Sequence, residues 1–482
     1  MGAGWADFPW GDGSVRKKVY LCGVFYQNLD KMKKIFIAVA AAVVAVGAYA
    51  EGYQINTLSA RQEGMGHTGV ALKLGAESMI FNPAGLSFSD KTIDLTGTLT
   101  AIKPMASATI DGTRYESHNK VSTPIAFNAA FRVRDYLQLG ISFYTPYGSS
   151  INWGMNWPGA VLNQKVNLAT YTVQPTVSWR ITPKLSVGAG LMLTWGTVDL
   201  NKGLVTSADV DRVLPMIGMM TGQNYPLFNG VTPASVNLTG TADLAFGFNI
   251  GAMYDISSKV TVGASFRSKM LMKVKSGDAH VSFANEVAKR LLEDKVGLID
   301  QANFSASMPL PYVLVFGAAY RPTSRWTVAA DIQLTGWKTY RRLDIEFPGV
   351  ANGSFDQHID KRYRNAWCFH LGAEWAATEK LDLRAGLMVD QTPVNDNHYN
   401  PETPGMTKIE PTVGLSFRPI KQLSVDFSFM YVAGVGKDNV KGSYENFIAK
   451  AYPNIGLDAN PEIKGNYRVH AFAPAIGLRY CF

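Results

Sequence analysis

The sequence of 482 residues is poor in the residues from which enzymes and metal centres are commonly built. It has three cysteines, and Cys368 and Cys481 are too far apart in sequence to indicate a disulfide framework. The seven histidines are scattered, and no serine, histidine and acid constellation stands out by position. We therefore expect no enzymatic activity, no metal site and no cofactor.

Long hydrophobic runs and strong net charge are also missing. The apolar run at residues 35–48 is shorter than the roughly 20 residues that a membrane-spanning helix needs, and no later segment reaches that length. Only 17% of the residues are charged, and the formal net charge of +8 is modest for this length. This charge does not argue for nucleic acid, and we expect no nucleic-acid partner. Yet 47% of the residues are hydrophobic, so they must be spread thinly over many segments.

Many segments alternate between apolar and polar or small residues. Residues 423–431 read Leu-Ser-Val-Asp-Phe-Ser-Phe-Met-Tyr, and residues 185–196 and 381–390 follow the same period of two. This period predicts strands with one apolar face and one polar or small face. A large soluble β protein would also show it.

The connections between these segments are alternately short and long, which a soluble β protein has no reason to require. Antiparallel strands that cross a bilayer place odd and even connections on opposite sides, and outer-membrane barrels have short periplasmic turns and long extracellular loops. The short connections are 134–135, 181–184, 255–259, 321–325, 377–380 and 418–421. The long ones are 106–120, 148–164, 201–235, 276–302, 348–361, 392–404 and 435–464. We predict an all-β transmembrane barrel of about 14 antiparallel strands over residues 91–482.

The two ends of the chain indicate export to an outer membrane. Lys33 and Lys34, the apolar run and a small-residue site ending at Ala50 predict a signal peptide at residues 32–50. Residues 1–31 make little sense before an export signal, and we interpret them as a non-native upstream extension. The last residue is Phe482, and similar barrels end on an aromatic residue that the outer-membrane assembly machinery reads. An even strand number then places both termini in the periplasm of a Gram-negative-type bacterium.

The glycine-rich residues 51–90 lack a clean period and are expected to fold into the barrel as a plug, or hatch. Gly64 to Gly69 match the spacing of a dinucleotide fingerprint, but no strand precedes them and no βαβ unit follows, so we reject a nucleotide site. The segment resembles the FadL/TodX family of outer-membrane channels for hydrophobic compounds. The resemblance lies in Gly52-Tyr53-Gln54-Ile55-Asn56, in Gly64-Met65-Gly66-His67-Thr68-Gly69-Val70-Ala71 and in Ile80-Phe81-Asn82-Pro83-Ala84-Gly85-Leu86.

The resemblance implies a monomeric barrel of fourteen strands in which the hatch lies against an inward kink of the third strand. The gate residues would be Asn82, Pro83, Ala84 and Gly85. We expect the third strand at residues 136–147, and glycine or proline can bend or interrupt a strand. The kink candidates are Gly140, Pro146 and Gly148.

Two long loops and one basic strand are further candidates for ligand binding. The loops could capture a greasy ligand through Leu214, Met216, Met219, Met220, Leu291 and Leu292, although these residues could equally pack on one another. Arg267, Lys269, Lys273 and Lys275 share one parity of the seventh strand and should line the lumen. There they could attract a carboxylate headgroup or pair with acids in the lumen.

The resemblance therefore implies passive transport of hydrophobic molecules through the outer membrane. We expect long-chain fatty acids, captured by the loops, held in the barrel and released sideways into the membrane lipid. Aromatic hydrocarbons and other lipophiles cannot be separated from fatty acids on the sequence. A general porin and an outer-membrane hydrolase are the remaining alternatives.

Overall fold

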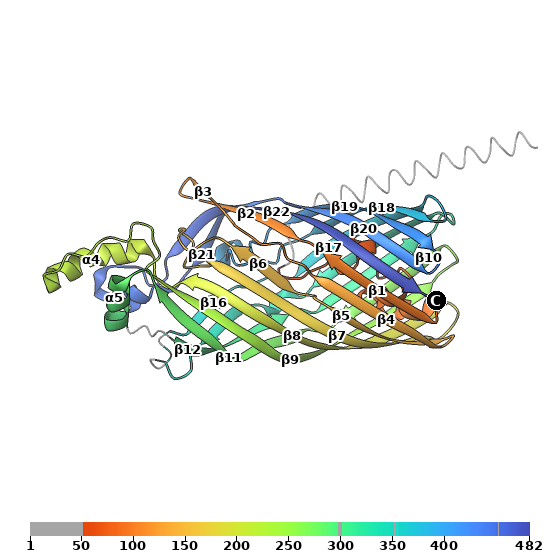
Figure 1. Ribbon diagram of the computed structural model, residues 1–482, viewed down its shortest axis with the longest axis horizontal. Helices are drawn as coiled ribbons and strands as arrows, with labels where there is room; N and C mark the ends of the chain where they lie inside the picture. Colours follow the sequence, from red (N-terminus) through yellow and green to blue (C-terminus); the bar gives the residue numbers. More distant parts are fainter. Residues whose placement is uncertain (1–51, 297–300, 351–352, 354, 452) are drawn as a thin grey trace, which may run out of the picture. The chain divides into compact units, whose positions relative to one another are not determined.

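The computed structural model describes residues 52–296, 301–350, 353, 355–451 and 453–482, and the strands among them form one antiparallel sheet (Figure 1). The predicted signal peptide and upstream extension lie outside these residues. No helix in the described part of the chain has the length and apolar character needed to cross a bilayer.

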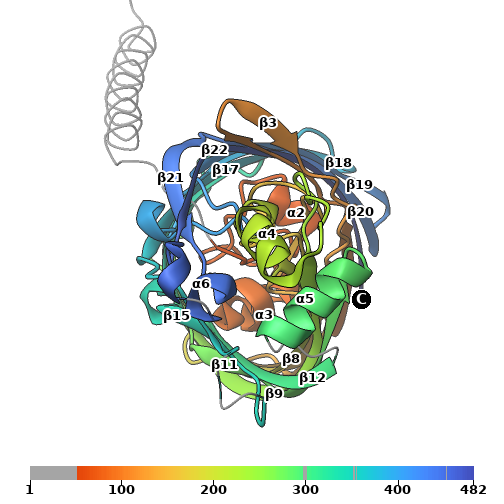
Figure 2. The ribbon, with the colours of Figure 1, turned by 90° about the vertical axis from the view of Figure 1, so that its left-hand side faces the viewer.

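Fourteen strands pair in sequence around a closed ring, and the first pairs with the last (Figure 2). The predicted barrel and its strand number are confirmed. In ring order the strands are β1 (Ile93–Thr100), β4 (Ile125–Arg134), β5 (Leu137–Tyr144), β7 (Lys165–Arg180), β8 (Leu185–Gly203), β9 (Ala234–Asp255), β10 (Val260–Arg267), β13 (Val313–Tyr320), β14 (Trp326–Thr335), β17 (Ala366–Ala376), β18 (Leu381–Asp390), β19 (Lys408–Ile420), β20 (Leu423–Gly434) and β22 (Glu462–Cys481).

Eight further strands continue the ring strands toward the end of the barrel that carries the long loops. They are β2 (Lys103–Ile110), β3 (Thr113–Glu116), β6 (Gly148–Asn152), β11 (Met270–Phe283), β12 (Gln301–Leu310), β15 (Arg342–Glu346), β16 (Gln357–Asp360) and β21 (Lys437–Ser443). Parts of the expected loops, such as 106–110 and 276–283, therefore belong to strands. Strands such as β3, β16 and β21 carry mostly polar residues on both faces, so the apolar alternation did not mark them.

The predicted alternation matches the two faces of the wall. In β20, Phe427 is 47% exposed on the outside, whereas its neighbour Asp426 is 5% exposed and faces the interior. Leu191 and Leu383 are likewise exposed, and Met192 and Arg384 are buried. An outer surface of Phe, Leu, Ile and Val is costly in water and is typical of a wall that faces lipid.

The short and long connections gather at opposite ends of the barrel. The long-loop end carries α4 (Ser207–Thr221), α5 (Glu286–Val296) and α6 (Phe447–Ala451), together with the short turns η3 (Trp337–Thr339), η5 (Asp396–His398) and η6 (Pro453–Ile455) (Figure 1). The helix α4 begins where the Thr206 hydroxyl accepts the N–H of Asp209 and ends at Gly222, whose φ is +70°. The C-terminus lies at the short-turn end.

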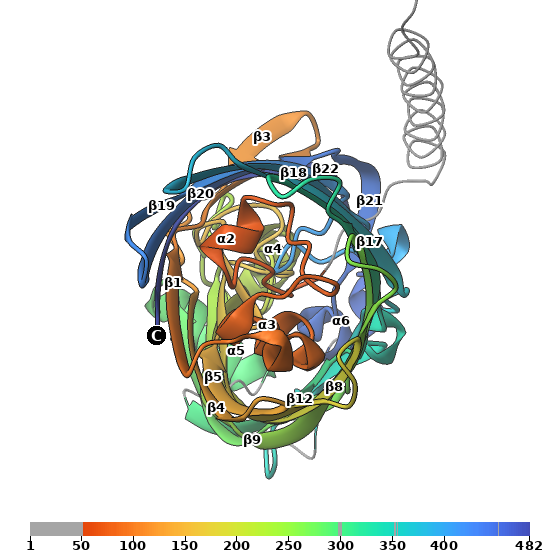
Figure 3. The same cartoon turned by 90° about the vertical axis from the view of Figure 1, so that its right-hand side faces the viewer.

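Residues 52–90, called the N-terminal segment below, lie inside the ring (Figure 3). The segment contains α2 (Ala60–Glu63), η1 (Gly75–Glu77), α3 (Ser78–Phe81) and η2 (Pro83–Phe88). Ser59 caps α2, and Asn82 caps η2 with Pro83 at its first position. Helices of one turn are unstable alone, so their conformation depends on packing against the wall.

A charge on the outer face tests the membrane-facing assignment. We expect Leu191→Arg to lower the free energy of unfolding in lipid vesicles by about 2–4 kcal/mol, because an arginine at the bilayer midplane costs that much. Thr197→Arg, on the same face of β8 nearer the long-loop end, should cost only about 0–1 kcal/mol, as for a position at the interface. Equal costs in urea titrations would show that β8 does not cross the bilayer at Leu191.

Candidate functional site

Asn82 connects the N-terminal segment to the barrel wall. Its side chain is fully buried and donates to the carbonyls of Val70 at 2.7 Å and Ala252 at 3.0 Å. Its Oδ1 accepts the N–H of Ala84 at 3.1 Å. The side chain therefore uses both donors and its acceptor to fix the turn and attach it to β9.

Glycines of the wall allow this turn to approach closely. A Cβ built on Gly188 of β8 would lie 2.4 Å from the carbonyl carbon of Pro83, and one on Gly251 of β9 would lie 2.0 Å from Asn82 Oδ1. The Ala84 carbonyl accepts hydrogen bonds from Ser178 and Ser186 at 3.3 and 2.7 Å. The hydrogen bonds of the predicted gate residues are thus to β7, β8 and β9, rather than to the third strand.

The glycine-rich residues 64–71 pack closely against the wall, from Gly414 of β19 at one end to Gly263 of β10 at the other. Gly69 and Val70 donate their N–H groups to Asp331 Oδ2 of β14 at 2.6 and 3.1 Å. Gly66 has a φ of +61°, and a Cβ there would lie 2.6 Å from the carbonyl oxygen of Leu371. Close backbone packing therefore accounts for the glycine spacing that matches a dinucleotide fingerprint.

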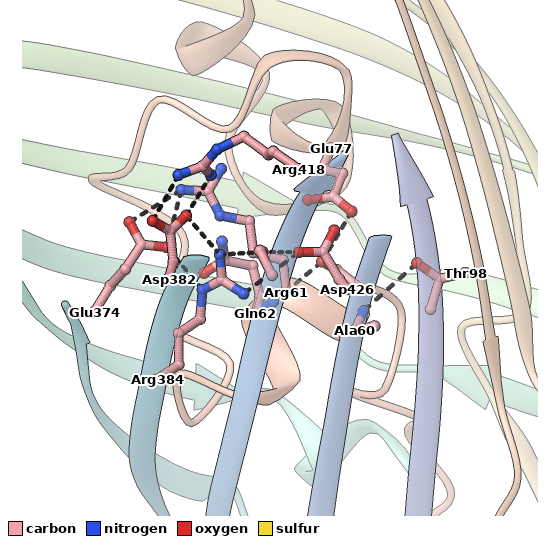
Figure 4. A network of polar contacts seen from close by, with 12 residues as sticks. Ala60, Arg61, Gln62, Glu77, Thr98, Glu374, Asp382, Arg384, Arg418 and Asp426 are labelled. Carbon is pink, nitrogen blue, oxygen red and sulfur yellow. Dashed lines mark hydrogen bonds and ion pairs between the residues drawn. The ribbon is translucent and has the colours of Figure 1, made fainter. Parts of the chain in front are cut away.

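Buried ion pairs hold α2 to β17, β18 and β20 (Figure 4). Glu374 accepts from Arg61 at 3.2 Å and from Arg384 at 2.7 Å, and Arg384 also donates to Ser416 at 2.6 Å. Arg418 forms a forked pair with Asp382 at 2.5 and 2.7 Å. Removing one member of such a network leaves a buried charge unpaired. Parity placed Asp382, Arg384 and Asp426 inward, but nothing in the sequence indicated that Arg61 would join them.

Glu63 is a buried acid next to this network. Ser428 donates to its Oε1 at 2.9 Å, while Oε2 has no hydrogen-bond partner. Desolvation raises the pKa of Glu63 to about 8, because it outweighs the stabilisation of the carboxylate by Ser428. The neutral acid is therefore the favoured form at neutral pH.

The third strand is interrupted between β5 and β6, at residues 145–147. There the N-terminal segment adds to its edge: Ile55 donates to the Pro146 carbonyl at 2.8 Å, and Gly148 donates to the Tyr53 carbonyl at 2.9 Å. Pro146 therefore lies in the interruption and Gly148 begins β6. Gly140 differs from the expectation, because it pairs regularly with Ala130 and Thr176. It instead provides space for Met79 of α3.

An apolar cavity of about 100 Å³ lies on the long-loop side of Tyr53. Its lining includes Leu168, Leu200, Met272, Val274, Phe304, Leu343 and Ile345. Tyr53 closes it together with an aromatic cluster, in which its ring centroid is 4.7 Å from that of Trp337 and 5.8 Å from that of Tyr340. The Tyr53 hydroxyl donates to the Pro309 carbonyl at 2.5 Å.

Two buried lysines lie near this cavity, one paired with a residue of its lining and the other in a neighbouring cavity. Glu402, which lines the cavity, forms an ion pair with the fully buried Lys361. Lys202 lines a neighbouring cavity of about 210 Å³ and donates to Gln357 Oε1 at 2.8 Å. Leu200 and Lys202 are successive inward positions of β8, so the two cavities are stacked along that strand. Sequence reasoning missed these residues because they lie in expected loops.

The basic residues of the seventh strand do not form one inward stripe. Arg267 faces the interior and donates to the Ile80 carbonyl at 3.1 Å. Lys269, Lys273 and Lys275 are exposed, whereas Met270, Met272 and Val274 between them are buried. The strand is interrupted between β10 and β11, and the inward parity changes there. The prediction that all four line the lumen is wrong for the three lysines.

The predicted capture residues fall into two groups. Leu214 of α4 and Leu291 and Leu292 of α5 are buried within the loops. Met216 is partly exposed, and Met219 and Met220 are 80% and 81% exposed, at the end of α4. Among the described residues, no cluster of histidine, cysteine or acidic side chains could hold a metal ion.

A family profile, "Outer membrane protein transport protein (OMPP1/FadL/TodX)", matches residues 41–482. The chain belongs to this family. Outer membrane protein P1 of Haemophilus influenzae is 23% identical over 94% of this chain and 100% of its own length. A long-chain fatty acid transport protein of Escherichia coli is 23% identical over 83% of this chain and 91% of its own length.

Solved structures of the family share the fold of this chain. A Pseudomonas aeruginosa FadL homologue has a TM-score of 0.73 at 18% identity, over 89% of this chain and 99% of that chain. The toluene transporter TbuX of Ralstonia pickettii has a TM-score of 0.62 at 17% identity, with the same coverage. The family thus includes proteins named for fatty acids and for aromatic compounds, and its members are transporters of hydrophobic compounds.

The raised pKa of Glu63 predicts a pH dependence. A folded-state pKa of about 8 against an ordinary value of 4.5 means that the folded protein holds the proton more tightly than the unfolded chain. This contribution to stability is present below pH 4.5 and is lost as the pH rises through about 8. Glu63→Gln should therefore reduce the fall in unfolding free energy across that window. An unchanged pH dependence in the variant would contradict the assignment.

Proposed function

We propose that this protein carries long-chain fatty acids passively through the outer membrane, from the long-loop end to a sideways exit at the third strand. The observation that carries the proposal is the position of Tyr53, which closes the apolar cavity with its ring while the backbone beside it occupies the edge of the interrupted strand. One displacement of residues 53–55 would release both contacts. Cavity and exit would then open together.

In this proposal the N-terminal segment is a hatch and the long loops are extracellular. Residues 32–50 are a signal peptide, both termini lie in the periplasm, and the protein acts as a monomer after insertion by the outer-membrane assembly machinery. Asn82, Pro83, Ala84 and Gly85 anchor the hatch to β7, β8 and β9, while residues 53–55 form its movable end. The exposed Met216, Met219 and Met220 of α4 offer a flexible apolar surface for first capture.

A sideways exit suits a ligand that is poorly soluble in water. Exposing an acyl chain of roughly fourteen methylenes costs on the order of 11 kcal/mol, at about 0.8 kcal/mol per methylene. A route from an apolar cavity into lipid avoids most of that cost. Diffusion down a gradient then needs no energy source.

The charges around the cavity favour a ligand with a carboxylate. Lys202 and Lys361 are both buried, and Glu402 pairs with Lys361. Lys202 has Gln357, a neutral amide, as its hydrogen-bond partner. A buried cation beside a neutral partner is costly unless an anion joins it. A fatty acid could supply that anion with its head toward Lys202 and its chain in the apolar cavity.

Aromatic hydrocarbons are the second candidate, supported by the shared fold with toluene transporters. A hydrocarbon would use the apolar cavity but would bring no carboxylate to Lys202. A general porin is less compatible with this interior, because the N-terminal segment bonds to β7–β9 on one side and to β14 and β17–β20 on the other.

Uptake of radiolabelled long-chain fatty acid tests the proposal in cells that lack their own channel. The unaltered protein should restore uptake. Asn82→Ala with Pro83→Ala should reduce it several-fold, because the hatch loses its bonds to Val70 and Ala252 and its preset turn. Surface labelling must show equal amounts of both proteins in the outer membrane. If neither protein restores uptake while a labelled aromatic hydrocarbon enters, the second candidate replaces the first.

The carboxylate assignment has its own test. Lys202→Met should weaken binding of a long-chain fatty acid to the purified protein, with little effect on its methyl ester. Lys165→Met is the matched control, since Lys165 already pairs with Asp199 at 2.5 Å near the same end of β8. Equal losses for acid and ester would mean that Lys202 acts through packing and not through charge.

A further inference from the structure

The wall contains a second place, besides the third strand, where its ladder of paired residues is interrupted. Residues 249–255 of β9 pair with β10, and residues 234–239 pair with β11. Within the described structure, residues 240–247 of β9 have no paired residue in either strand. We call the boundary between these residues and residues 269–277 the β9/β11 seam. Figure 1 shows β9 and β11 side by side toward the long-loop end.

Irregularities of several strands meet at this seam. The β8–β9 register shifts between Thr194 and Gly196, so that Asp243 and Leu244 of β9 bulge opposite Trp195. The β11–β12 register shifts between Val274 and Gly277. Bulges of this kind re-aim side chains and locally end pairing. Their convergence makes the seam a built discontinuity of the barrel.

Side chains close the seam where backbone pairing does not. A Cβ on Gly247 would lie 2.7 Å from Met270 Cγ, and one on Gly240 would lie 2.7 Å from Val274 Cγ1. The side chains of β11 therefore fill the space that the glycines of β9 leave. Beyond them, Ser268 exchanges hydrogen bonds with the backbone of Phe248 at 2.8 and 2.9 Å.

The seam separates the apolar cavity from the outside of the barrel. Ala242, Met272 and Val274 line the cavity on its inner side. On the outer side, Leu244, Phe246 and Leu271 are exposed apolar residues. Next to Leu244, on the side of the long-loop end, Asp243 and Lys275 form an exposed ion pair at 2.6 Å. This change from apolar to charged residues is typical of the edge of a bilayer, where lipid chains meet headgroups.

We propose that the β9/β11 seam is a second lateral passage, through which a single acyl chain moves between the cavity and the outer edge of the bilayer. It opens by rotamer changes of Met270, Met272 and Val274, and no paired residues of the ladder separate. Unbranched methionines suit this role because they adapt to differently shaped apolar surfaces. The N-terminal segment stays in place when the seam opens, so this step needs no movement of the hatch. The inference rests on the proposed function for the identity of the ligand, a fatty acid.

The first test asks whether lipid chains reach the cavity through the seam, and it needs no transport. Cys368 and Cys481 are replaced by serine, and a bimane fluorophore is attached at Met272→Cys. The protein is placed in vesicles whose lipids carry a nitroxide quencher on the acyl chain near the headgroup. Quenching should be several-fold stronger than for the same label at Leu168→Cys, which lines the same cavity from β7. Equal quenching at both positions overturns the inference.

The second test holds the seam shut. Asp243→Cys and Lys275→Cys are bridged by a short bis-methanethiosulfonate, which forms reducible disulfides with both thiols by displacing methanesulfinate. The control bridges Leu191→Cys and Phe248→Cys, which are paired across β8 and β9. Uptake of fatty acid should fall several-fold with the seam bridge, recover on reduction and stay unchanged with the control bridge. Unchanged uptake with a bridged seam contradicts the passage. If the unbridged protein transports no fatty acid, the proposed function fails instead, and the quenching comparison alone decides the seam.

Discussion

The constraint on which this structure depends is that a chain in hydrocarbon must pair its own backbone donors and acceptors. A closed ring of fourteen strands meets it along most of the wall, because β1 pairs with β22 and no edge remains. The two proposed passages lie where the ladder is interrupted. At Pro146 the N-terminal segment supplies the missing partner, and at the β9/β11 seam the Ser268 side chain and packed methionines take over.

The same constraint explains how a segment with almost no regular structure is held inside the ring. Its donors and acceptors are paired with side chains that face the lumen: Asp331 takes two N–H groups, and Asn82 spans between Val70 and β9. On one side of the lumen, ion pairs of Arg61 and Arg384 with Glu374 attach the segment to the wall. On the other side, hydrogen bonds from Ser178 and Ser186 attach it. Residues 53–55, the end that the proposed function takes to move, are held by the Tyr53 hydroxyl on Pro309 and by backbone bonds to Pro146 and Gly148.

Much of the architecture could be predicted from the sequence, because a wall between lipid and lumen imposes a period of two that residues 185–196 and 423–431 keep without error. The interruptions could not be predicted in the same way. One extra residue in a strand reverses every side chain beyond it, so the change of parity between β10 and β11 turned Lys269, Lys273 and Lys275 outward. The triplet at Asn82 was found by resemblance, whereas Lys361, Glu402 and Asp331 come from distant segments that only the folded chain brings together.

Asp94 of β1 lies where three parts of the chain meet. Its carboxylate accepts from Arg479 of β22 at 2.7 and 2.9 Å and from the N–H of Ala76 in the N-terminal segment at 3.0 Å. The first strand, the last strand and the enclosed segment therefore share one anion. The segment precedes β1 in the chain, so a ring that closed without it would have to admit it afterwards through a narrow end. Closure around a segment already seated on Asp94 avoids that threading, and it makes the last step of barrel assembly cooperative with the docking of the first residues of the folded chain.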